Sequence, residues 1–117
     1  MRKLMLIIAL LAAFCPNASA QSDYWQKKAR GYQREAEYYQ KKAASHRREA
    51  EYHLRRAESY QREAAYYSKR GDVGKAKTQT RYAQREMDSY KTEMRHASEA
   101  DEKAAMYLRW AADALRH

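Results

Sequence analysis

Basic side chains recur at every seventh position in the first half of this sequence and could hold an anionic ligand. On a helix of 3.6 residues per turn such a row follows one stripe, with about 10 Å between its members. The stripe can attract an anionic polymer, lipid head groups or a client protein, whereas the alternative is a solvated face that only keeps the chain soluble. The row consists of Lys27, Arg34, Lys41, Arg48, Arg55, Arg62 and Lys69.

Tyrosines form a second row, spaced by fourteen residues. Helical geometry places this row well away from the stripe of alanines and rings on the same helix that is described below as its seam. Such rings can bury against a second copy of the chain, which would give a four-helix homodimer, or they can stack on the sugar rings or bases of a ligand. We expect dimerisation. The row comprises Tyr24, Tyr38, Tyr52 and Tyr66.

Histidines supply the remaining candidate chemistry. His46 and His53 lie about 10 Å apart along one stripe, too far to share a metal ion within one chain. We therefore expect no cofactor, and we expect His46 to face Asp101 in a polar layer that fixes the alignment of two helices. The alternative is a metal-handling protein whose site is completed across a dimer by seam residues: His46, His53, Asp101, Met87 and Met94.

Motifs that support catalysis are missing from the sequence. It contains no glycine-rich phosphate loop, no HExxH and no serine with a positioned base and acid. The glutamates of the first half lie on a helix surface, where water would keep their acidity ordinary. We expect a protein that is not an enzyme.

Alanines at every seventh position predict the elements that carry these rows. Each is followed three residues later by a ring, which is the spacing of a two-position coiled-coil seam. The alanine series is Ala29, Ala36, Ala43, Ala50, Ala57 and Ala64, and the ring series is Tyr32, Tyr39, His46, His53, Tyr60 and Tyr67.

The alanine spacing changes phase at the stretch RGDVGK, which predicts a turn. Gly71 suits the left-handed position after a helix, and Asp72 can cap the next helix. We therefore predict a first helix over residues 21–70, a turn over 71–74 and a second helix over 75–117.

The second helix repeats the alanines with a different partner spacing, four residues instead of three. This reversal is what antiparallel pairing requires, and it predicts layers whose residue numbers add to 147, such as Tyr32 with Leu115 and His53 with Met94. The fold class predicted is all-α, a long antiparallel two-helix hairpin whose alanine seam resembles the close-packed coils called Alacoils. The second set of alanines is Ala76, Ala83, Ala97, Ala104 and Ala111.

Residues 1–20 have the pattern of a secretory signal peptide, with a basic start, an apolar run and a small-residue cleavage site. The apolar run is shorter than the roughly 20 residues that span a bilayer, so we expect no transmembrane segment in the mature chain. We expect export to the periplasm or the cell exterior. The chain is basic, with a formal net charge of +9, yet export disfavours nucleic acid as its ligand.

These observations favour an exported, non-enzymatic helical hairpin that binds an anionic envelope component or a client protein through the basic row. The basic helices are similar to the helical tentacles of periplasmic OmpH-type chaperones, although the sheet that trimerises that family is missing here. The rivals are the metal-handling protein described above and a passive structural spacer.

Overall fold

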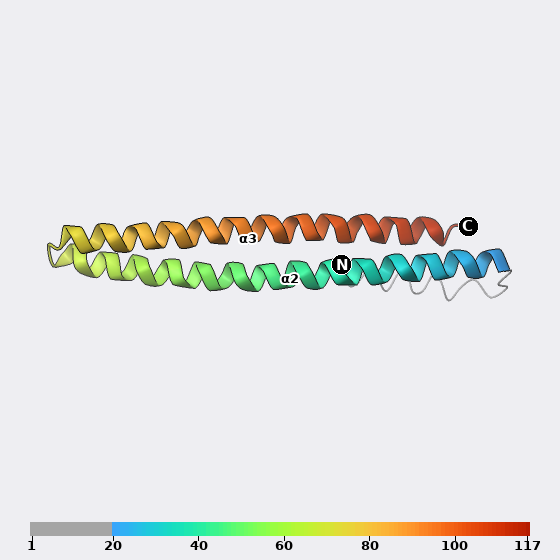
Figure 1. Ribbon diagram of the computed structural model, residues 1–117, viewed down its shortest axis with the longest axis horizontal. Coiled ribbons are helices and arrows are strands. Elements are labelled where there is room, and N and C mark those ends of the chain that lie inside the picture. The colour runs from blue at the N-terminus through green and yellow to red at the C-terminus, as the bar shows by residue number, and fades with distance from the viewer. Residues whose placement is uncertain (1–19) are drawn as a thin grey trace. The chain divides into compact units, whose positions relative to one another are not determined.

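The computed structural model describes residues 20–117, which form two α-helices joined by a short turn. Helix α2 spans Ala20–Lys69 and helix α3 spans Val73–Ala114 (Figure 1). The described residues contain no strand, so the prediction of an all-α helical hairpin is confirmed. Neither helix carries an apolar stretch long enough to cross a bilayer. Residues 1–19 of the predicted signal peptide lie outside the described part of the chain.

The chain divides into two compact units. The described part of unit 1 comprises residues 20–42 of α2 and residues 99–117, most of which belong to α3. Unit 2 comprises residues 43–98 and contains the turn. In each unit a segment of α2 packs against a segment of α3 that runs in the opposite direction (Figure 1).

Alanines form the contact between the helices, as the seven-residue spacing predicted. Every buried side chain among the described residues is an alanine, except Leu108. In unit 1 the buried residues are Ala29, Ala36, Ala100, Ala104, Leu108, Ala111 and Ala114. In unit 2 they are Ala43, Ala50, Ala57, Ala83 and Ala97. Because alanine is small, such a seam lets the two backbones approach closely.

A further row of α3, not predicted from the sequence, also faces α2. It follows by three residues the seven-residue series of α3, in which Tyr90 takes the place of one alanine, whereas we predicted only the row that follows by four. The predicted register is also wrong, because His53 contacts Glu86 and Tyr32 contacts Tyr107, pairs whose numbers add to 139 and not to 147. The additional row is Glu86, Glu93, Ala100, Tyr107 and Ala114.

The turn has the geometry that its residues predicted. Gly71 has a φ of 79°, and the N–H groups of Gly71 and Asp72 donate to the carbonyls of Ser68 and Tyr67. These two bonds are the Schellman arrangement that closes a helix. Oδ1 of Asp72 then accepts a bond of 3.1 Å from the N–H of Lys75, which caps α3. This cap lets α3 begin at Val73, two residues earlier than predicted.

Replacing Gly71 by alanine is expected to lower the free energy of unfolding by about 1 kcal/mol. Nothing lies within 4 Å of an added Cβ, so the cost comes from the positive φ alone. The matched control is Gly31→Ala, which lies inside α2 with equal space and is expected to stabilise by about 0.5–1 kcal/mol. Urea unfolding followed by circular dichroism measures both, and effects of the same sign would contradict the turn geometry.

Candidate functional site: a cationic face on helix α2

The seven residues of the basic row are all exposed, so α2 presents an unbroken series of cations to solvent. Arg55 forms an ion pair with Glu51 of its own helix. For the other six members the structure shows no ion pair within the described residues. The row therefore carries charge that the chain itself leaves largely uncompensated.

The tyrosine row is about half exposed, and each of its rings lies beside a cation from the next turn of α2. The charged groups lie 5.6, 6.0, 5.5 and 4.6 Å from the ring centroids. Residues four apart on a helix are neighbours, which is why the same contact recurs in every fourteen-residue repeat. The pairs are Tyr24 with Lys28, Tyr38 with Lys42, Tyr52 with Arg56, and Tyr66 with Arg70.

Each of these tyrosines also contacts a ring of the seam. The contacts are edge-on, with centroids 5.1–5.3 Å apart. The neighbours are Trp25 for Tyr24, Tyr39 for Tyr38, His53 for Tyr52 and Tyr67 for Tyr66. Each tyrosine thus contacts both a seam ring and a cation of its own helix, and its use as a dimer interface stays a prediction.

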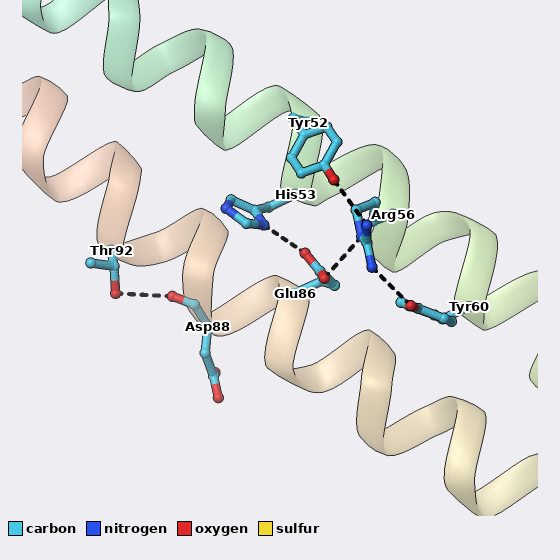
Figure 2. A network of polar contacts seen from close by, with 7 residues as sticks. All are labelled: Tyr52, His53, Arg56, Tyr60, Glu86, Asp88 and Thr92. Atoms are coloured by element: carbon cyan, nitrogen blue, oxygen red, sulfur yellow. Dashed lines mark hydrogen bonds and ion pairs between the residues drawn. The ribbon is translucent and has the colours of Figure 1, made fainter.

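Arg56 is the most highly connected cation of this face (Figure 2). Its guanidinium donates to the hydroxyls of Tyr52 and Tyr60 at 2.9 and 3.0 Å, and its Nε donates to Glu86 of α3 at 3.0 Å. The two hydroxyls, Tyr52 first, raise the pKa of Arg56 above its ordinary value, so the group stays charged. The Tyr52–Arg56 pair is therefore also hydrogen-bonded to α3.

Glu86 also binds the histidine that precedes this arginine on α2. Nδ1 of His53 donates to Oε2 of Glu86 at 2.6 Å, while Oε1 accepts from Arg56 (Figure 2). The Glu86 side chain is only 16 % exposed. A carboxylate shared by two donors of the opposite helix fixes the alignment of α2 and α3 in unit 2.

His46, seven residues earlier on α2, makes the same kind of contact. Its Nδ1 donates to Oε2 of Glu93 at 2.6 Å, and its ring lies 5.2 Å from that of His96. A polar contact of His46 with α3 was expected, but its partner Glu93 was missed because it belongs to the additional row of α3. The pairing of His46 with Asp101 stays a prediction.

The described residues offer no arrangement of ligands for the metal-handling alternative. Within them, no group of three or more histidine, cysteine or acidic side chains is placed to hold a metal ion. His46 and His53 are each hydrogen-bonded to a glutamate of their own, Glu93 and Glu86.

Comparisons of the chain with protein-family models, with curated proteins and with solved structures find no match. The fold and this site by themselves define the class of the protein: a helical hairpin in which one helix carries a cationic face lined by tyrosines.

Proposed function

We propose that this chain is an exported, non-enzymatic binding protein that holds an anionic polymer of the cell envelope against the basic row of α2. The observation that carries the proposal is the row itself, in which six exposed cations have no ion pair within the described residues. A regular series of such charges suits a ligand whose negative charge also repeats along its length.

The Tyr–cation pairs support the same proposal. They add four cations beside the row, and each is already positioned over a ring before any ligand arrives. A homodimer that covers part of this surface remains compatible with the proposal, since the basic row and the tyrosine row occupy different stripes of α2.

Neutralising three members of the row tests the proposal. In the triple variant R48Q/R55Q/R62Q, the affinity for linear polyphosphate at low salt is expected to fall about tenfold or more. The dependence of affinity on salt is expected to become shallower, because fewer counterions are displaced. Isothermal titration calorimetry over a series of salt concentrations measures both quantities.

The matched control is K77Q/R81Q/K91Q, which removes the same charge from exposed positions of α3 in the same unit. At about 0.15 M salt in the same series, binding by this control is expected to stay within about twofold of the unmodified chain, since screening at that ionic strength limits the effect of distant charges. Equal losses in the two variants would show that only net charge matters, and the basic row would then be a solvated face.

A further inference from the structure

Unit 1 contains an aromatic groove that shares Lys28 with the cationic face of α2. The groove has a volume of about 260 Å³ and is lined mainly by Trp25, Lys28, Tyr32, Trp110, Asp113 and His117. Both tryptophans of the chain lie in it. Pockets with aromatic walls and a few polar groups are the usual form of small-ligand sites, and this volume suits a single ring.

The rings of the groove are held by contacts within unit 1. His117 stacks on Trp25 with centroids 4.0 Å apart, and Tyr32 meets Trp110 edge-on at 5.6 Å. Tyr107 supports Trp110 from α3 itself at 5.3 Å. Trp110 nevertheless stays 43 % exposed, more than Trp25 or Tyr32, so much of its surface is left for a ligand.

The charges of the groove select among possible occupants. Nζ of Lys28 lies 5.5 Å from the centroid of Trp25, so a cation already occupies the aromatic wall and a cationic ligand would be repelled. Asp113, whose Oδ1 forms an ion pair with Arg116 at 3.5 Å, adds a carboxylate whose other oxygen can accept hydrogen bonds. A ligand that fits has an apolar ring face, hydroxyls that donate to Asp113 and an anionic group for Lys28.

We propose that this groove binds a sugar ring that carries a carboxylate, as in a chain of uronic acids. This inference rests on the proposed function and deepens it, since it makes the anionic polymer a glycan. In unit 1 the basic row continues with three exposed members, Lys27, Arg34 and Lys41, which can take further carboxylates of the same chain. A polyanion without rings gains nothing from the tryptophans.

Tryptophan fluorescence reports on the groove directly, because the chain has no tryptophan elsewhere. Titration with an oligogalacturonate is expected to change the emission saturably, whereas polyphosphate is expected to bind without such a change. Trp110→Leu is expected to weaken oligogalacturonate binding about tenfold by calorimetry, the size of one lost stacking contact, and to leave polyphosphate binding unchanged. Tyr82→Leu, which changes an exposed aromatic of α3 in unit 2, is the matched control and is expected to leave both unchanged.

Lys28→Gln tests the contribution of the lysine charge to binding separately from that of the aromatic rings. It is expected to weaken binding of oligogalacturonate and to leave the weaker binding of a neutral oligosaccharide, maltotriose, unaffected. Equal affinity of the unmodified chain for the two saccharides would overturn the assignment of a carboxylate to Lys28.

Other outcomes also overturn the proposal. A loss of polyphosphate binding in Trp110→Leu equal to that of oligogalacturonate would assign the tryptophan a structural role. Tighter, Trp110-dependent binding of a single-stranded oligonucleotide would make the ligand a nucleic acid, and an emission change that follows protein concentration alone would make the occupant a second copy. If polyphosphate binds and oligogalacturonate does not, the groove assignment fails while the proposed function stands; if neither binds, both fail.

Discussion

Replacing Ala50 by leucine is expected to lower the free energy of unfolding by about 1–3 kcal/mol. Ala50 is 1 % exposed in the seam of unit 2, so its methyl group is almost fully enclosed by neighbouring atoms. A leucine there must push the helices apart or adopt a strained rotamer. Helix propensity does not contribute, because leucine and alanine both favour helices. Urea unfolding followed by circular dichroism gives the difference.

The control for this substitution is Ala65→Leu. Ala65 lies on the exposed side of α2 in the same unit, so the added atoms meet solvent and the change is expected to stay within about 0.5 kcal/mol. If the two variants unfold at the same urea concentration, the alanine seam is not closely packed.

Replacing Glu86 by alanine is expected to lower the free energy of unfolding by about 1–3 kcal/mol. Glu86 is the shared acceptor of His53 and Arg56, and its removal leaves the half-buried ring of His53 without this carboxylate. The loss exceeds that of an ordinary surface pair because the Glu86 side chain is mostly shielded from water. Thermal and urea unfolding at neutral pH provide the measurement.

Glu51→Ala serves as the control, because it removes an ion pair with Arg55 whose two side chains are more than half exposed. Its effect is expected to be about 0.5 kcal/mol or less. A double-mutant cycle between His53 and Glu86 gives the pairwise energy, and a coupling near zero would show that the two groups do not stabilise the hairpin together.

The seven-residue repeat predicted the two helices, the turn and most of the buried alanines, although Ala64 and Ala76 are only half-buried and Ala100 and Ala114 were missed. Heptad counting works here because a single small residue type marks one seam position throughout α2. The turn could be predicted because Gly71 and Asp72 have distinct backbone and capping preferences. The exposed basic row followed from the same counting, since that position points away from the seam.

The contacts between side chains were harder to predict. The additional row of α3, with Glu86 and Glu93, was missed because a two-position repeat names only two rows of each helix. The register was wrong because a seven-residue repeat matches almost equally well when one helix slips by seven residues. The Tyr–cation pairs had a detectable signal, since tyrosine and a cation recur four residues apart in every fourteen. The aromatic groove had no such signal in the sequence. Trp25 and Trp110 are far apart along the chain, and only the pairing of the helices brings them to one groove.

The alanine seam also determines how this hairpin responds to temperature. Leu108 is the one buried side chain of the described residues that is larger than alanine, so unfolding exposes little apolar surface for each residue released. Exposure of apolar surface is the source of the large positive heat-capacity change of unfolding. With a small heat-capacity change the curve of stability against temperature is shallow. The hairpin therefore loses stability gradually on both warming and cooling.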